Sequence, residues 1–365
     1  MRIAIDCRKI ADYGIGTYIR GLLSGLAAAD ADHEYVLFGP ESAESRIPRD
    51  SRFRLVRDDS PHYSVREVIT IGRKIEAARA ELFHAPHYVV PFTSAPTVVT
   101  IHDLIHLHQP LRNPLGRPYA RLMIGRAVRR SRGILAVSET VGRELAEAYP
   151  EAAGKITVTP NAVDAALLEA LPAADDESLV RRGLSRRRYL LYVGNDKPHK
   201  NVQVLIAAWR DVRSRHPRIS LVLVGGAFRR FAGEERVVRT AFLALEDLAA
   251  FYRGAFAVIV PSLEEGFGLP AAEGMAIGVP VITSDAAALM ETTGEGALHF
   301  AARDSAALGR AIDSLFADDR LRRALIERGR ARSREFSWQR CAQLTLAAYE
   351  AANSEQRAAN RGDDR

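Results

Sequence analysis

Short apolar, β-branched runs alternate with helix-length stretches along almost the whole chain. In order, the runs are "RIAID", "EYVLFG", "FRLVR", "ELFHA", "TVVTIHD", "GILAVS", "KITVTP", "YLLYVG", "SLVLVG", "RTAFLA", "FAVIVPS", "PVITS" and "ALHF". Strands separated by helix-length spacers are typical of parallel sheets that carry helices on both faces. We therefore predict an α/β fold, and 365 residues correspond to roughly two domains at about 150 residues per domain.

A polar stretch without a strand signal, "LLEALPAADDESLVRRGLSRR", separates the seventh run from the eighth. Such composition is typical of a linker, so we predict one Rossmann-like domain over residues 1–175 and a second over residues 176–337. The segment "FSWQRCAQLTLAAYEA" predicts a last helix over residues 338–352, whose Trp338 and Tyr349 should pack on a larger body. The polar remainder, residues 353–365, is predicted to be disordered.

Composition disfavours several classes of protein. No apolar run approaches the roughly 20 residues that cross a bilayer, and the N-terminal "MRIAIDCRKI" lacks the apolar core of a secretory signal. Cys7 and Cys341 are the only cysteines and lie far apart, which argues against a disulfide framework and a zinc site. These features favour a cytoplasmic protein in a reducing compartment.

The formal charge of +6 is unevenly distributed, because residues 112–132 carry seven arginines and no acidic residue. The spacing in this segment predicts a helix that carries both apolar residues and arginines. One interpretation is an ordinary solvated face. The other is a peripheral surface for anionic lipid headgroups or phosphorylated acceptors, since each basic residue near a membrane contributes about 1 kcal/mol. Nucleic acid is disfavoured, because no stacking aromatic residues interleave with the arginines.

Ligands of open α/β sheets bind beyond the carboxyl ends of the strands, so the loops after strands are the candidate sites. In "PSLEEGFGLPAAEGMAIG", an apolar run is followed by Glu264 and Glu265, a Gly-Phe-Gly turn, and a helix whose first turn contains Glu273. The two glycines permit close approach of a ligand to the backbone, and Pro270 suits a first helical turn. Helix-dipole and capping effects account for each acidic residue singly but leave the whole string unexplained.

The run from Glu265 to Glu273 resembles the Glu-x7-Glu signature of the retaining glycosyltransferases of family GT4, which have the two-domain GT-B fold. Five further motifs resemble that family in the same order along the chain: "YGIGTY", "TIHDL", "ILAVSE", "VTPNAVD" and "YVGNDKPHKN". The resemblance covers nearly the whole chain apart from its tail. It implies two Rossmann-like domains facing a cleft, with the C-terminal helix crossing back to the N-terminal domain.

The resemblance implies that Glu265 and the backbone at Phe267 and Gly268 hold hydroxyls of the donor sugar, while Glu273 accepts hydrogen bonds from the ribose of the nucleotide. Carboxylates suit vicinal diols because each offers two acceptor oxygens. Glu264 has no implied role and is interpreted as a solvated side chain. The other donor-binding residues implied here are Gly266, Leu269, Gly16 and Asn195.

Lys200 matches the family lysine that contacts the diphosphate, and its ammonium would stabilise charge on the leaving group. The chain departs from the commonest family pattern at Asn195, where many members carry an arginine. A second cation must then come from Lys197 or elsewhere, or be absent. In this region the chain is similar to the mannosyltransferase branch of polysaccharide and O-antigen assembly.

In the first half, His102 and Asp103 follow a strand and match the family's His-Asp motif. The implied role of His102 is to position the sugar, with Asp103 fixing the ring tautomer. His84, His87 and Asp103 are candidates for the acceptor side. Gly14 and Gly16 precede a helix whose N-terminus suits the acceptor and the diphosphate, respectively.

The resemblance implies transfer of a hexose with retention at the anomeric carbon. We expect no cofactor and no metal, because the only Asp-x-Asp, Asp30 to Asp32, lies at the end of a predicted helix rather than after a strand. The branch resemblance favours GDP-mannose as donor and a glycan or lipid-linked saccharide as acceptor. Two alternatives stay open: an enzyme of the sucrose or trehalose synthase type that uses a UDP- or ADP-sugar, and a catalytically silent binding subunit.

Overall fold

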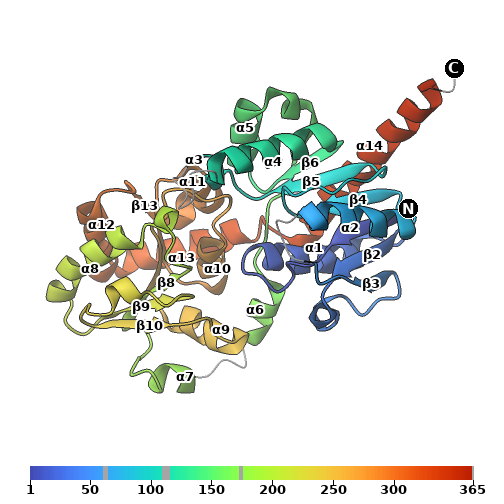
Figure 1. Ribbon diagram of the computed structural model, residues 1–365. Coiled ribbons are helices and arrows are strands. Elements are labelled where there is room, and N and C mark those ends of the chain that lie inside the picture. The colour runs from blue at the N-terminus through green and yellow to red at the C-terminus, as the bar shows by residue number, and fades with distance from the viewer. Residues whose placement is uncertain (61–64, 109–115, 172–175, 364–365) are drawn as a thin grey trace. The chain divides into compact units, whose positions relative to one another are not determined.

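The computed structural model describes residues 1–60, 65–108, 116–171 and 176–363, and the side chains of these residues except 65–68 and 357–363. The chain divides into two compact units (Figure 1). Unit 1 comprises Met1–Asn161 together with the residues from Ser337 onward, and unit 2 comprises Ala162–Phe336. Two α/β units confirm the predicted fold class.

Unit 1 is built on a seven-stranded parallel sheet in the order β3-β2-β1-β4-β5-β6-β7. Its strands are β1 (Arg2–Asp6), β2 (Glu34–Gly39), β3 (Phe53–Arg57), β4 (Leu82–Ala85), β5 (Thr97–Ile101), β6 (Gly133–Ala136) and β7 (Ile156–Val158). The helices are α1 (Ile15–Ala29), α2 (Val65–Ala77), α3 (Ile105–His108), α4 (Gly116–Arg130), α5 (Glu139–Ala148) and α14 (Trp338–Asp363). Strand order reverses between β1 and β4, which is the switch point where ligands of such sheets bind.

Unit 2 contains a six-stranded parallel sheet in the order β10-β9-β8-β11-β12-β13. Its strands are β8 (Tyr189–Val193), β9 (Ser220–Val224), β10 (Val237–Thr240), β11 (Ala257–Val260), β12 (Val281–Ser284) and β13 (Ala297–Phe300). The helices are α6 (Ala165–Ala170), α7 (Glu177–Val180), α8 (Val202–Arg215), α9 (Leu245–Gly254), α10 (Leu269–Ile277), α11 (Ala287–Thr293), α12 (Ser305–Ala317) and α13 (Asp319–Ser333). Here the order reverses between β8 and β11.

The tenth predicted strand lies earlier than expected. The sequence pattern favoured "RTAFLA", but β10 ends at Thr240 and residues 241–244 form a loop before α9. Val237 and Val238 pair with Leu221 and Val222 of β9. The register of that neighbour therefore fixes the strand, and Phe242 lies outside it.

The predicted boundary at residue 175 is corrected to the junction of Asn161 and Ala162. Helix α6 lies in the expected linker but packs against α9 of unit 2. The guanidinium of Arg253 in α9 donates a hydrogen bond to the carbonyl of Leu171 at 2.9 Å. These contacts attach the first part of the polar stretch to unit 2.

Helix α14, red in Figure 1, returns the end of the chain to unit 1 and packs against α1. Gly21 and Gly25 of α1 form a groove for Trp338, because a Cβ at either position would overlap that residue. Tyr349 is fully buried, and its hydroxyl lies 2.6 Å from Nδ1 of His84. The predicted crossing helix is thus confirmed.

The tail expected to be disordered continues α14 as far as Asp363. Ala, Glu, Gln and Arg are good helix formers, so this composition can extend a helix that packing has already nucleated. The predicted tail therefore forms the last turns of α14 over its described part.

Candidate functional site

Two loops meet at the switch point of unit 2. The loop after β8 contains the short helix η3 (Pro198–Lys200), and the loop after β11 contains Glu265. The ammonium of Lys200 lies 2.6 Å from Oε1 of Glu265, and their side chains are 19% and 10% exposed. The two predicted charged residues are therefore brought together at the carboxyl edge of the sheet, although 65 positions apart in sequence.

Glu265 is also held by a second residue, which the sequence motifs did not indicate. The hydroxyl of Ser262, fully buried, donates to Oε1 of Glu265 at 2.7 Å. Oε1 thus accepts from both Ser262 and Lys200, which fixes the orientation of the carboxylate. The side chain of Glu264 is half-buried, so it is less exposed to solvent than the solvated side chain that was predicted.

The Gly-Phe-Gly turn brings main chain rather than side chain to this edge. Gly268 has φ of 90° and precedes α10, and a Cβ there would overlap Leu289, so glycine is required. The ring of Phe267 is buried and packs edge-on against Phe336 at 5.1 Å between centroids. Phe267 is therefore a core side chain, while Gly266 and Leu269 lie in the same turn at the start of α10.

Glu273 lies one helical turn further along α10, where it meets Tyr252 of α9. The fully buried Tyr252 hydroxyl donates to Oε2 of Glu273 at 2.5 Å. Burial raises the pKa of Glu273 to about 7, and the charge of Asp164 adds to the increase while the Tyr252 hydrogen bond opposes it. This carboxyl group therefore titrates near neutrality.

The turn after β8 is ordered by its own polar groups. Oδ1 of Asn195 accepts from the backbone N–H of Lys197 at 3.1 Å, and the carbonyl of Asn195 accepts from the Tyr192 hydroxyl at 2.7 Å. Asp196 forms an ion pair with Arg230 from the loop after β9. Asn195 shapes the turn but carries no charge, and Lys197 is exposed.

In unit 1, His102 lies at the carboxyl end of β5 and is partly buried. Its Nε2 lies 2.8 Å from the carbonyl oxygen of Pro86, so Nε2 carries the proton and Nδ1 is left as an acceptor. Burial lowers the pKa of His102 to about 4, so the ring is neutral at physiological pH. It can accept a hydrogen bond from a hydroxyl group at Nδ1.

Asp103 has a different contact from the one expected. Its Oδ1 accepts from the backbone N–H of Ile105 at 3.1 Å, at the start of α3. The carbonyl of Pro86 therefore determines the His102 tautomer, and Asp103 stabilises the turn beside it.

His84 is a core residue rather than an acceptor contact. It is fully buried, with Nδ1 2.6 Å from the Tyr349 hydroxyl and Nε2 2.8 Å from Oγ1 of Thr100. Burial lowers the pKa of His84 to about 3. Both nitrogens are occupied within the protein, so the predicted acceptor-side role is not supported by its position.

His87 belongs to a buried charged cluster after β1 and β4. Its Nδ1 accepts from the backbone N–H of Val89 at 3.1 Å, and its Nε2 lies 3.4 Å from Oδ2 of Asp6. Asp6 also forms a two-pronged ion pair with Arg8, at 2.6 and 2.8 Å. Burial opposes ionisation of Asp6, but Arg8 and His87 outweigh it and hold the pKa of Asp6 well below its usual range. Sequence reasoning missed this cluster because Arg8 appears only as one basic residue in a loop.

The glycine loop precedes α1 as predicted. Gly14 occupies the N-cap position, with φ of 71°. A Cβ at Gly16 would lie 2.7 Å from the Ile10 carbonyl oxygen, so glycine lets the loop fold closely against the helix. Asp30 at the other end of α1 accepts from the Tyr35 hydroxyl at 2.5 Å and contacts Nδ1 of His33 at 2.8 Å, as expected for a polar loop residue.

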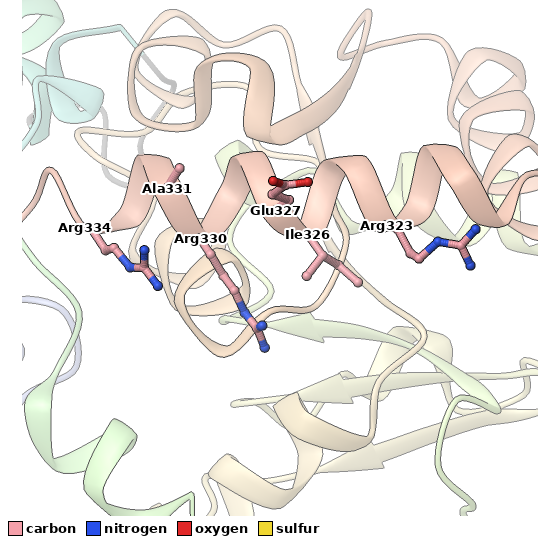
Figure 2. Close-up of a pocket in the computed structure, with 6 residues that line it drawn as sticks. All are labelled: Arg323, Ile326, Glu327, Arg330, Ala331 and Arg334. Carbon is pink, nitrogen blue, oxygen red and sulfur yellow. The ribbon is translucent and has the colours of Figure 1, made fainter.

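A hollow along α13 is separate from these residues. It is lined by Arg323, Ile326, Glu327, Arg330, Ala331 and Arg334, and Figure 2 shows the three arginines extending from the same side of the helix. Arg330 donates to the Ile277 carbonyl at 3.3 Å, at the end of α10. None of the predicted site residues lines this hollow, and Arg330 has a capping role there.

Comparison with known proteins identifies the family. Residues 13–167 match the family described as "Glycosyltransferase Family 4", and residues 181–332 match "Glycosyl transferases group 1". The chain is 28% identical to O-antigen chain mannosyltransferase B of Escherichia coli, over 92% of this chain and 95% of that protein. It is 33% identical to an MMP alpha-(1->4)-mannosyltransferase of Mycolicibacterium hassiacum, over 70% of this chain and 66% of that protein.

Among solved structures, sucrose-phosphate synthase from Thermosynechococcus elongatus has a similar fold, with a TM-score of 0.77 and 22% identity over 96% of this chain and 98% of that chain. One family match covers most of unit 1 and ends within α6, the other lies in unit 2, and together they include Lys200, Glu265 and His102. The chain is therefore a glycosyltransferase of family 4 with the GT-B fold.

Proposed function

We propose that this glycosyltransferase moves a hexose from a nucleotide diphosphate sugar to a hydroxyl of a glycan or lipid-linked acceptor in cell-surface polysaccharide synthesis. The favoured donor is GDP-mannose, supported by the similarity to mannosyltransferases over most of the chain. The observation that carries the proposal is the Lys200–Glu265 pair at the switch point of unit 2. The likeness to sucrose-phosphate synthase is one of fold and favours no particular substrate.

The roles follow from the charges and acceptors. Glu265 has its second carboxylate oxygen, Oε2, to offer to sugar hydroxyls, because Ser262 and Lys200 both engage Oε1. Lys200 approaches the diphosphate and neutralises its charge as it leaves. Glu273 accepts the ribose hydroxyls when ionised, and the neutral His102 accepts a sugar hydroxyl at Nδ1.

In the proposed step, the bond between the anomeric carbon and the diphosphate oxygen breaks while the acceptor oxygen bonds to the same face of that carbon. The acceptor's hydroxyl proton passes to the departing phosphate. We propose this retaining route without a covalent enzyme intermediate, because Glu265, held at Oε1 by two partners, uses Oε2 to hold sugar hydroxyls rather than to attack the anomeric carbon. Neither a metal nor a cofactor enters the scheme, and the charge is stabilised by Lys200 and the N-terminal end of α10.

The experiment is a donor screen. The protein is incubated with GDP-mannose, UDP-glucose and ADP-glucose, with and without a lipid-linked saccharide, and released nucleoside diphosphate and glycosylated product are measured. We expect GDP release with GDP-mannose, an α-linked product by NMR, and an unchanged rate in EDTA. A UDP- or ADP-sugar preference would replace the donor assignment. Tight nucleotide binding without turnover of any donor would favour the silent subunit.

We propose in addition that α4 contacts an anionic membrane surface. Of the segment 112–132, residues 109–115 lie outside the described residues, but α4 exposes Arg117, Arg121, Arg129 and Arg130. Leu122 is 62% exposed, and Tyr119 is also exposed beside these arginines. Several exposed cations on one helix, with exposed apolar side chains between them, suit a surface of acidic headgroups. No helix in the described part of the chain is long and apolar enough to span a bilayer.

Sedimentation with vesicles tests this contact. We expect binding to vesicles of phosphatidylglycerol, little binding to phosphatidylcholine, and loss of binding in the Arg121→Glu, Leu122→Ala double variant. Arg323→Glu on α13 is the matched control for a change of charge elsewhere. Equal binding of both variants to the acidic vesicles would contradict the assignment to α4.

A further inference from the structure

The charges at the switch point of unit 2 are nearly balanced before any ligand binds. Lys200 is paired with Glu265 at 2.6 Å, and a nucleoside diphosphate would bring two or more negative charges to the same edge. One ammonium, shared with a carboxylate, is a weak counter-charge for such a group. A second cation in reach of the turn after β8 would offer further N–H donors to the phosphate oxygens.

Arg230 occupies that position in the described structure. Its Nε lies 3.0 Å from Oδ1 of Asp196, inside the turn between Gly194 and Lys200. Asp196 is 25% exposed and Arg230 is 45% exposed, so the pair lies at the surface of the turn and is open to a ligand. Arg230 comes from a different loop, the one that follows β9, and reaches the turn across the sheet edge.

Buried aromatic residues hold Arg230 in place. It belongs to the short helix η4 (Arg229–Phe231), which follows the buried ring of Phe228 and ends at the buried ring of Phe231. Phe228 has φ of 42° and packs edge-on against Tyr192 of β8, at 6.0 Å between ring centroids. The guanidinium of Arg230 lies over the Phe231 ring at 4.9 Å. The loop conformation is therefore set by the core, and Arg230 is directed at the turn.

The hydroxyl of Tyr192 is affected by the charges of both Arg230 and Glu265. Burial raises the pKa of Tyr192 well above its usual value, and the charges of Glu265 and Asp196 add to this while that of Arg230 opposes it. Tyr192 also donates to the Asn195 carbonyl at 2.7 Å. Glu265, Asp196 and Arg230 thus act electrostatically on one hydroxyl group at the end of β8.

We infer that Arg230 is a second cationic ligand for the diphosphate of the donor. The inference rests on the proposed function. In the unliganded chain Asp196 holds the guanidinium over the turn, and on binding the guanidinium turns its N–H donors to phosphate oxygens, to which its planar fork is well suited. Asn195 in the same turn is uncharged, and Arg230 supplies from the neighbouring loop the charge that Asn195 does not.

The alternative is an ordinary surface ion pair between Arg230 and Asp196, which would contribute little. The two explanations differ in what Asp196 does. If the ion pair alone mattered, Asp196→Asn and Arg230→Ala would have the same effect. If Arg230 binds the diphosphate, Asp196→Asn releases the guanidinium and leaves diphosphate binding unchanged or tighter.

The test is a calorimetric comparison of GDP, GMP, UDP and UMP binding to the full chain. Arg230→Ala should weaken binding of the preferred diphosphate by about 10-fold or more, with a change of about 2-fold or less for the monophosphate. Arg230→Lys should retain part of the affinity. The matched control is Arg229→Ala, which removes the neighbouring exposed arginine and should leave both affinities unchanged, and an unchanged Tm shows that each variant is folded.

The outcomes separate the inference from the proposed function. If the wild-type chain binds neither diphosphate, the proposed function and the inference both fail. If it binds one and Arg230→Ala binds it equally well, the inference alone fails. Equal losses in Arg230→Ala and Asp196→Asn would also overturn it, because they would assign the effect to the ion pair.

Discussion

Replacing Tyr252 by Phe should make donor binding depend on pH in a new range. The change removes one hydroxyl, which donates to Glu273 at 2.5 Å from a fully buried position, and leaves the ring in place. A hydrogen bond to a charged group contributes about 1.5–3 kcal/mol, and 1.36 kcal/mol corresponds to one pH unit. The pKa of Glu273, raised by burial to about 7, should therefore rise in the variant to roughly 8–9.

The direction of the effect follows from the acceptors that the ribose needs. An ionised carboxylate can accept from both hydroxyls, whereas a protonated one has lost acceptor capacity. Donor affinity should rise with pH, with a midpoint near 7 in the wild type and at least about one unit higher in the variant. At pH 7.5 the donor KM of Tyr252→Phe should be roughly 3- to 20-fold higher, and the two proteins should converge above pH 9.

The assay is the donor KM measured from pH 6 to 9.5, with Glu273→Gln as control. That variant cannot ionise at this position and should bind weakly without a pH midpoint near 7. The reasoning is refuted if Tyr252→Phe has the wild-type midpoint, or if Glu273→Gln keeps the wild-type slope. A thermal melt at each pH is needed as well, because ionisation of Glu273 also changes stability. Its pKa is raised in the folded chain, so the free energy of unfolding should fall as pH rises from about 4.5 to 7.

Three further changes have defined outcomes. Lys200→Ala should lower kcat about 100- to 1000-fold, the usual result of losing a charge-stabilising donor, and a loss confined to KM would contradict its role at the leaving group. His102→Ala should lower kcat/KM. Because burial holds the pKa of His102 at about 4, the pH profile of the wild type should show no inflection from this ring between pH 6 and 9. An inflection in that range that disappears in the variant would disprove the neutral-acceptor assignment. Trp338→Ala should destabilise unit 1 by about 3–5 kcal/mol, visible as a lower Tm in differential scanning calorimetry, and an unchanged Tm would show that the Gly21–Gly25 groove does not depend on the indole.

Much of the fold could be predicted because parallel strands buried on both faces leave a strong pattern. The thirteen predicted runs correspond to the thirteen strands among the described residues, with only the tenth displaced. The donor side was predictable for a related reason: Lys200 and Glu265 follow strands that are neighbours across the switch point, so the topology brings them together.

The remaining features depend on contacts that sequence does not record. His84 ends in the core because Tyr349, from the far end of the chain, covers it. Arg230 could not be distinguished from Arg229 by sequence, since the contact with Asp196 depends on the conformation of the loop, in which Phe228 has a left-handed backbone. The domain boundary was displaced because α6 has the composition of a linker and the packing of a helix.

The return of α14 to unit 1 also affects how the chain can fold while it is being synthesised. Unit 2 is contiguous in sequence, whereas unit 1 needs residues from both ends of the chain. When Asn161 leaves the ribosome, the groove on α1 and the ring of His84 still lack their covering helix, so unit 1 cannot complete its core. Unit 2 contains its strands and helices within one continuous segment, so it can form its core without α14. We therefore expect the N-terminal unit to complete its core only after α14 has left the ribosome.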